Sequence, residues 1–185
     1  MTAPVQPSLT TARLVLRPFV REDAREVQRL AGDSRIAEST LVPHPYPDGL
    51  AESWIDGHGP SYRAGREVVY AVTQREGGRL VGAVSLLSVS ETHARAEVGF
   101  WIGTAYWGRG YCTEAVRALM DFAAASLGIT RFVGRCVASN LASAAVMAKA
   151  GMSPEGRLPK HEFRGGRYVD QLLFGCLLPG RGTEP

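Results

Sequence analysis

The sequence predicts a single α/β domain built on a mixed sheet, and three observations support this. Its 185 residues suit one domain with one core. Two strand patterns flank Gly77 and Gly78, which indicates an antiparallel hairpin. Later in the chain a strand, a helix and a strand follow one another, which indicates a parallel pair joined by a right-handed crossover. We expect one domain over residues 1–185, with flexible tails at 1–8 and 179–185.

The first third of the chain reads as short elements around a long irregular segment. Residues 12–19 alternate between apolar and polar, which predicts an edge strand that Pro18 ends. Short helices are expected at residues 23–31 and 50–61. Between them, residues 43–47 include three prolines, so this stretch is rigid and irregular. Loops of this length in a compact domain are usually functional.

Strand alternation, helical runs and the glycines that follow those runs define the other elements. The expected elements are strands at 67–75, 79–89 and 94–102, a helix at 113–127 closed by Gly128, a strand at 131–137, a helix at 140–150 stopped by Gly151, and two strands near 152–156 and 168–177.

Composition excludes several functional classes. Apolar residues make up 45% and charged residues 21%, and the net charge of +3 is scattered, so a dedicated nucleic-acid surface is not expected. No stretch approaches the roughly 20 apolar residues of a membrane helix, and the N-terminus has no leader pattern, so we expect a cytoplasmic protein with no membrane partner. The cysteines form no C-x-x-C pair, so neither a disulfide framework nor a metal site is expected.

The stretch YWGRGYCTEA, residues 106–115, joins a strand to a helix and predicts an anion site. Gly108 and Gly110 let the backbone turn sharply and approach a ligand closely. Unpaired N–H groups and the helix dipole then suit a phosphate or diphosphate. Two glycines before a helix are by themselves weak support for this. A P-loop would need Gly-Lys-Ser/Thr, and a dinucleotide fingerprint would need a third glycine at Thr113, so both are excluded.

The run AEVGFWIGTAYWGRGYCTEA, followed after a strand by NLASAAVMAKAGM, closely resembles the GNAT acyl-CoA N-acyltransferase superfamily. The segments TARLVLRPFVREDA and RYVDQLLFG resemble its branch of RimJ- and RimL-type ribosomal-protein N-acetyltransferases. The resemblance implies a mostly antiparallel sheet of about six to seven strands with one splayed parallel pair and about four helices. It also implies acetyl transfer from acetyl-CoA to a primary amine, without a metal. A chain of this size could be a monomer or a homodimer, and the sequence does not choose between them.

By resemblance, backbone amides of the loop bind the coenzyme A diphosphate, and the preceding strand pairs with the pantetheine arm. The implied cofactor-binding residues are Phe100, Trp101, Ile102, Trp107, Gly108, Arg109, Gly110, Tyr111, Cys112, Thr113, Asn140 and Ser143. Trp107 and Cys112 depart from the family pattern of Gln/Arg and Gly/Ala. Neither change removes a main-chain donor, although the Cys112 side chain could crowd the phosphates.

Acyl transfer to an amine needs a base, donors for the oxyanion and a proton for the thiolate. Glu97 is the candidate base, acting through water, and it could equally be an outward carboxylate paired with Arg95 or with an arginine of a neighbouring strand. Asn140 suits a helix N-cap and, by resemblance, pantetheine binding. The family's tyrosine position is Met147 here, so the resemblance leaves Ser143 or a water as the proton donor.

Some assignments remain open at this stage. Val146, Met147 and Ala150 share a helix face and are expected in the core. A thiol at a helix N-terminus can be nucleophilic, so an acyl-enzyme on Cys112 is an alternative to direct transfer. By resemblance the acceptor cleft could be lined by His44, Tyr46, Glu162 and Phe163. The acceptor is either a protein N-terminus or a small amine, and a coenzyme A-binding sensor without turnover remains the alternative function.

Overall fold

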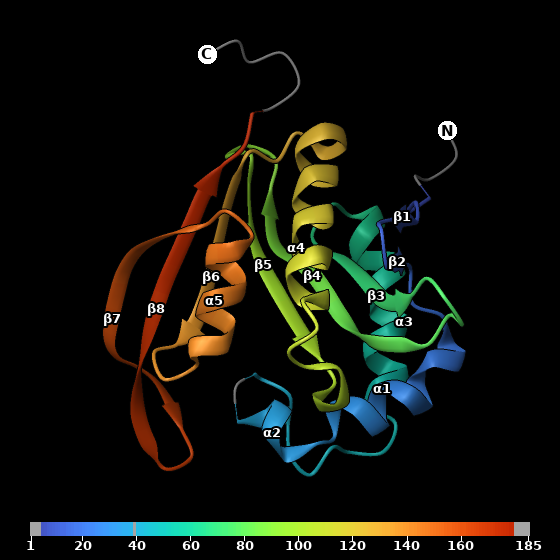
Figure 1. The fold of residues 1–185 in the computed structure, drawn as a ribbon, viewed down its shortest axis with the longest axis horizontal. Coiled ribbons are helices and arrows are strands. Elements are labelled where there is room, and N and C mark those ends of the chain that lie inside the picture. The colour runs from blue at the N-terminus through green and yellow to red at the C-terminus, as the bar shows by residue number, and fades with distance from the viewer. Residues whose placement is uncertain (1–4, 39, 180–185) are drawn as a thin grey trace.

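The computed structural model describes residues 5–38 and 40–179, which form one twisted sheet with helices on both faces (Figure 1). Of the expected tails, residues 1–4 and 180–185 lie outside the described part. Two hydrogen bonds tie the start of the described chain to the third strand. Gln6 Nε2 donates to the Val69 carbonyl at 2.9 Å, and the Tyr70 hydroxyl donates to the Pro7 carbonyl at 2.8 Å.

The sheet has eight strands in the order β1-β2-β3-β4-β5-β6-β8-β7. Their bounds are β1 Leu9–Thr10, β2 Leu14–Arg17, β3 Val68–Gln74, β4 Leu80–Ser90, β5 Arg95–Ile102, β6 Arg131–Val137, β7 Ser153–Arg164 and β8 Arg167–Leu177. Within the described sheet β5 and β6 are parallel and every other neighbouring pair is antiparallel. The expected mixed sheet with one parallel pair is confirmed, with one strand more than the expected number.

In the described part of the chain, five α-helices connect and cover these strands. They are α1 Ala24–Ala31, α2 Ser34–Ala37, α3 Leu50–Arg63, α4 Tyr111–Phe122, which a π-helical turn extends through Leu127, and α5 Leu141–Lys149. Figure 1 shows α4 and α5 in front of the sheet and α3 behind it. No helix in the described part is long and apolar enough to cross a membrane.

Three expectations about the strands and helices were wrong. The strand ending before Pro18 is not at the edge, because the two-residue strand β1 pairs on its outer side. Helix α2 was not expected, since four residues are too few to show a periodic pattern. Strand β7 continues to Arg164 rather than ending near Gly156, because it pairs with β8 along a long hairpin whose outer face is polar.

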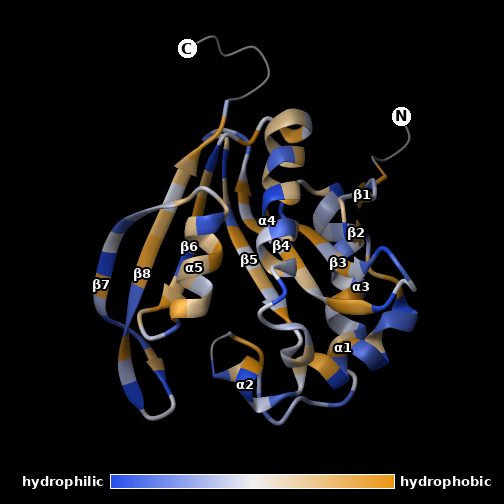
Figure 2. Ribbon diagram, in the orientation of Figure 1, coloured by the Kyte–Doolittle hydropathy of each residue, from blue (hydrophilic) through white to orange (hydrophobic). Residues whose placement is uncertain are grey.

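The core lies on both sides of the central strands. Figure 2 shows β3 to β6 largely in the hydrophobic colour, whereas β7 at the outer edge is largely hydrophilic. Tyr70, Leu119, Phe132 and Met147 are completely or almost completely buried, and each contributes about 1.5–3 kcal/mol by leaving water. Because helices bury both faces, the central strands read as nearly continuous apolar runs.

Strands β5 and β6 separate partway along their length. They pair only from Arg95 with Arg131 to Glu97 with Val133. Beyond this point β6 stays paired with β8 up to Val137, while β5 continues to Ile102 beside β4. The sheet is therefore open between the carboxyl ends of two parallel strands, which is where α/β proteins bind ligands.

Candidate functional site

The loop between β5 and α4 has the geometry of an anion site. Gly108 and Gly110 both adopt positive φ, 73° and 77°, a region that residues with a Cβ rarely enter. Helix α4 begins directly after Gly110. Within the described residues, no backbone carbonyl accepts a hydrogen bond from the N–H groups of residues 108–113. These donors lie at the positive end of the α4 dipole, so the loop is built to bind a negative charge.

The exposed side of β5 carries unpaired backbone groups. Gly103 N–H donates to the Val81 carbonyl of β4 at 2.8 Å. Because the backbone groups of a strand point to alternate sides, those of Phe100 and Ile102 face the opening toward β6. Trp107 Nε1 donates to the Ile102 carbonyl at 2.6 Å. The Phe100 groups and the Ile102 N–H are left to pair with an extended ligand.

Helix α5 contributes the other wall of this opening. Asn140 is its N-cap, and its Oδ1 accepts a hydrogen bond from Ser143 N–H at 3.0 Å, so the expected capping role is confirmed. The cap fixes the first turn of α5 and with it the place of Ser143, which is half-buried. Met147 and Ala150 are buried as expected. Val146 is a correction, because it is only partly buried and lines a cavity.

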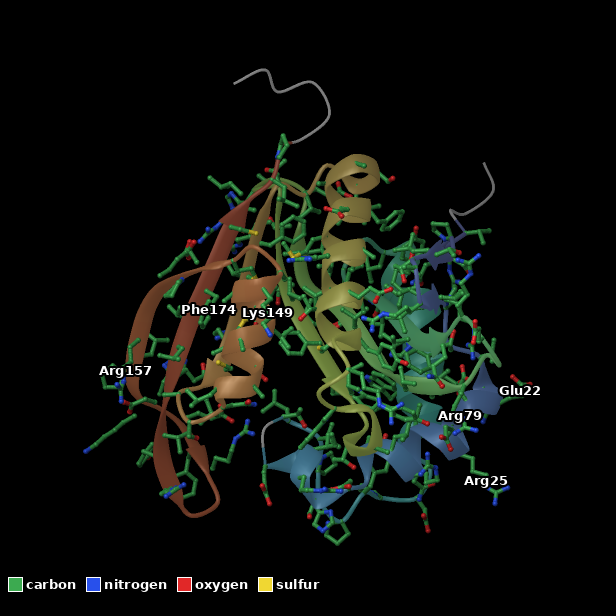
Figure 3. All side chains as sticks on the ribbon, in the orientation of Figure 1. Glu22, Arg25, Arg79, Lys149, Arg157 and Phe174 are labelled. Atoms are coloured by element: carbon green, nitrogen blue, oxygen red, sulfur yellow. The ribbon has the colours of Figure 1, made fainter. Side chains whose placement is uncertain are left out.

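A cavity of about 700 Å³ lies between α4, α5 and the end of β5. All of the expected cofactor-binding residues line it except Arg109. The Arg109 guanidinium instead lies over the Tyr106 ring, 5.6 Å from its centroid, and donates to the Ala105 carbonyl. Sequence reasoning missed Arg35 and Lys149, which also line the cavity; Lys149 projects from α5 (Figure 3).

A second cavity, of about 790 Å³, lies on the side of the sheet covered by α1 and α3. Of the four expected acceptor residues, Tyr46 and Glu162 line it. His44 and Phe163 do not. The His44 ring is 3.2 Å from the Gly32 carbonyl, and the Phe163 side chain is exposed on the β7–β8 hairpin, where it packs against Tyr168. Trp54, Arg135 and Gln171 line this cavity and were not expected.

The two cavities meet at the opening of the sheet. They share five lining residues: Thr40, Phe100, Trp101, Val137 and Ser143. A ligand entering along α4 and a second ligand entering past α3 would therefore come into contact beside Ser143. This arrangement suits a reaction between two bound molecules.

Glu97 faces the second cavity, but its carboxylate is already paired. Arg135 Nε donates to Oε1 at 3.0 Å and Arg135 Nη2 donates to Oε2 at 2.6 Å. The structure therefore shows the alternative considered above, an ion pair with an arginine of the neighbouring strand. Arg135 follows Val133, the residue aligned with Glu97, by two positions on β6, so both side chains point to one face.

Glu162 is held in a tighter polar cluster on the wall of the same cavity. Its Oε1 accepts from Arg164 Nε at 2.9 Å and Nη2 at 2.5 Å, and its Oε2 accepts from Gln171 Nε2 at 2.6 Å. Burial raises the pKa of Glu162, but these hydrogen bonds outweigh it and lower the pKa overall. Arg164 also donates to the Thr40 carbonyl at 2.8 Å, which ties the hairpin to the loop after α2. Gln171 Oε1 is buried without a partner among the described residues.

Cys112 does not have the properties of a nucleophile. Its side chain packs against the core beside the loop, and burial raises the pKa of its thiol to about 12. The helix N-terminus would have lowered this pKa, so desolvation is the larger effect. This pKa strongly disfavours, at neutral pH, the thiolate that an acyl-enzyme requires. The described residues also contain no cluster of side chains suited to a metal ion.

Comparison with known proteins agrees with this geometry. Residues 13–153 match the family model described as an acetyltransferase (GNAT) domain. The chain is 23% identical over 173 residues to the uncharacterized N-acetyltransferase YoaA of Bacillus subtilis, and the match covers 94% of this chain and 98% of that one.

Two of the solved structures that share the fold illustrate the similarity. The first is RimL, a ribosomal L7/L12 alpha-N-protein acetyltransferase in complex with coenzyme A; it has a TM-score of 0.84 and 20% identity, with 93% of this chain and 98% of that chain covered. The second is spermidine N-acetyltransferase from Vibrio cholerae in complex with CoA and spermine. It has a TM-score of 0.78 and 21% identity, and the match covers 90% of this chain and 96% of that chain.

Proposed function

The chain belongs to the GNAT acetyltransferase family and uses acetyl-CoA, and from this premise we propose that it transfers the acetyl group directly to a primary amine. The acceptor amine would occupy the second cavity and attack the thioester where the two cavities meet. A direct attack needs no covalent enzyme intermediate, which agrees with the raised pKa of the Cys112 thiol.

The observation that carries this proposal is the row of free N–H groups at residues 108–113. They open into a cavity that also exposes the unpaired backbone of Phe100 and Ile102. A diphosphate joined to an extended amide-containing arm is the kind of ligand that uses both features, since the diphosphate needs clustered donors and the arm needs a strand edge. Coenzyme A has this chemistry and supplies the acetyl group as a thioester.

Two carboxylates could remove the proton from the acceptor amine. Glu97 and Glu162 both line the second cavity. Both oxygens of Glu97 and the Oε2 of Glu162 accept one hydrogen bond each, so each of these three oxygens keeps a second lone pair. We propose that Glu97 acts through a bound water, with Arg135 fixing its orientation, and that Glu162 is the competing candidate. Backbone N–H groups near Ile102 would polarise the thioester carbonyl, and Ser143 would help to protonate the departing thiolate.

The acceptor class follows from two kinds of relative. RimL is named for a ribosomal protein and another relative for spermidine, so we propose a protein N-terminus or a small amine as the acceptor. The second cavity, with aromatic walls at Tyr46, Trp54 and Trp101, is large enough for either an aliphatic chain or the first residues of a peptide.

Thiol release from acetyl-CoA, measured against a panel of peptides with free N-termini, polyamines and amino acids, tests the proposal. We expect release with at least one class, and sequential kinetics. If calorimetry detects no binding of acetyl-CoA, the proposal is wrong. Binding without release in the presence of a cell extract would instead identify a sensor.

Paired variants separate the two bases. Glu97→Gln and Glu162→Gln keep the side-chain shape but remove the carboxylate. The base variant should lose turnover strongly at neutral pH and less at high pH, where the free amine is already neutral. If a variant has the same pH–rate profile as the parent protein, the residue replaced in that variant is not the base.

A further inference from the structure

The peptide between Arg109 and Gly110 is held from outside the loop. Arg13 Nη1 donates to the Arg109 carbonyl at 2.9 Å. In a trans peptide the carbonyl and the next N–H point in opposite directions, so this hydrogen bond also sets the direction of the Gly110 N–H. Glycines on both sides of Arg109 would otherwise let this peptide rotate at low cost. Arg13 therefore restrains one of the free donors of the anion loop.

Arg13 is itself fixed by helix α4. Arg13 Nε donates to Glu114 Oε2 at 2.7 Å, and Nη2 lies 2.6 Å from the same oxygen. The Arg13 main-chain N–H donates to Glu114 Oε1 at 2.9 Å, and Thr11 Oγ1 donates to it at 2.6 Å. The hydrogen bonds to the Glu114 carboxylate thus connect the turn between β1 and β2 to the first turn of α4.

Aromatic stacking adds a second restraint on Arg13. Its guanidinium lies over the Tyr111 ring, 5.0 Å from the centroid, and Gln74 Nε2 donates to the Tyr111 hydroxyl at 3.0 Å. The planar guanidinium can make the paired, stacked and carbonyl contacts at the same time, which a lysine ammonium cannot. An added Cβ at Gly110 would lie 3.4 Å from Arg13 Nη2, so the guanidinium packs directly against the loop.

Arg13 also neutralises a negative charge close to the anion loop. Glu114 lies in the first turn of α4, where a carboxylate would repel a bound anion. Burial raises the pKa of Glu114, but the hydrogen bonds from Thr11 and Arg13 outweigh it and lower the pKa overall, so the carboxylate stays ionised. The positive charge of Arg13 offsets it. Without Arg13 the loop would lose one restraint and face an uncompensated negative charge.

We propose that Arg13 is a positioning residue for the diphosphate of the acyl donor. It acts through the Arg109 carbonyl and through neutralisation of Glu114, and it does not touch the reacting atoms. The inference rests on the proposed function, since it assigns Arg13 to affinity for acetyl-CoA. It makes the turn between β1 and β2, far from Ser143 in the sequence, part of the donor site.

Kinetics with two acyl donors test this inference. Acetyl-CoA carries the diphosphate, and acetyl-pantetheine lacks it. For Arg13→Gln we expect the KM for acetyl-CoA to rise about tenfold or more, with kcat at saturation and the KM for acetyl-pantetheine unchanged. The matched control is Arg29→Gln, which removes a guanidinium paired with Glu26 at 2.6 Å and lying outside both cavities.

The ratio of the two KM values keeps the test decisive if the variant folds poorly, because a reduced active fraction lowers kcat for both donors and leaves both KM values unchanged. Arg13→Lys is the second variant, and it should raise the ratio by a smaller factor. An unchanged ratio in both variants overturns the inference. If the parent protein neither binds nor uses acetyl-CoA, the proposed function fails, and that outcome is distinct from an unchanged ratio.

Discussion

Replacing Gly108 with alanine should weaken binding of the acyl donor without disturbing any contact. Gly108 has a φ of 73°, and an added Cβ would meet no atom within 4 Å. The only penalty is therefore backbone strain, about 1–2 kcal/mol for a residue with a Cβ in the left-handed region. In the free protein the loop can relieve this strain by leaving its binding conformation.

The magnitude follows from that strain. If the strain raises the free energy of the binding conformation by about 1–2 kcal/mol relative to the relaxed loop, the apparent KM for acetyl-CoA rises by about 5- to 30-fold. Steady-state kinetics at varied acetyl-CoA and fixed amine measure the KM, and urea unfolding measures the free energy of unfolding. We expect kcat at saturating donor to change little, because the acetyl group lies away from this loop.

Gly128 provides the matched control at the other end of α4. Its φ is 69°, and an added Cβ would again meet no atom within 4 Å. Gly128→Ala should therefore carry a similar strain and leave the KM for acetyl-CoA unchanged. If Gly108→Ala also leaves the KM unchanged, the assignment of this loop to the donor is refuted. An equal rise in the KM of both variants would show that the effect is not specific to the loop at residues 108–113.

Three further predictions concern groups outside the reacting centre. Because burial raises the pKa of Cys112 to about 12, alkylation by iodoacetamide at neutral pH should be at least about tenfold slower in the native than in the unfolded protein, as measured by peptide mass spectrometry. Burial lowers the pKa of His58 from its ordinary 6.5 to about 4. Between these two pH values the His58 ring is protonated in the unfolded chain but not in the folded protein, so the free energy of unfolding falls as pH drops from 6.5 toward 4. His58→Phe should remove up to about 3 kcal/mol of that pH dependence in urea titrations, and an unaltered slope would contradict it. Asp23→Asn removes the charge of a buried carboxylate that pairs with the partly exposed Arg17, so it should cost about 1.5–3 kcal/mol of unfolding free energy, and no measurable loss would contradict this.

The parts of the site that could be predicted are those with a local signature. Two glycines before a helix, a strand that alternates into them and an asparagine at a helix start each encode their conformation within a few residues. Gly108, Gly110 and Asn140 were accordingly identified with their surroundings, and the mixed sheet with one parallel pair followed from the order of elements.

The parts that could not be predicted depend on register between distant segments. The partner of Glu97 is Arg135, 38 residues away on the next strand, and the sequence did not decide between this ion pair and a free base. Gln171 reaches Glu162 because β7 and β8 form a long hairpin that was expected to be shorter. His44 was assigned to the acceptor cavity from its loop alone, whereas its ring turns toward the Gly32 carbonyl.

The wall shared by the two cavities has a practical consequence for inhibitor chemistry. Since donor and acceptor would enter from opposite faces of the sheet, neither entrance is blocked when the other is filled. A conjugate that links coenzyme A to an amine through a short acyl spacer would pass through the opening between β5 and β6 and occupy both cavities at the same time. Such a bisubstrate compound would lose the entropy of association only once, so its affinity should far exceed that of either fragment.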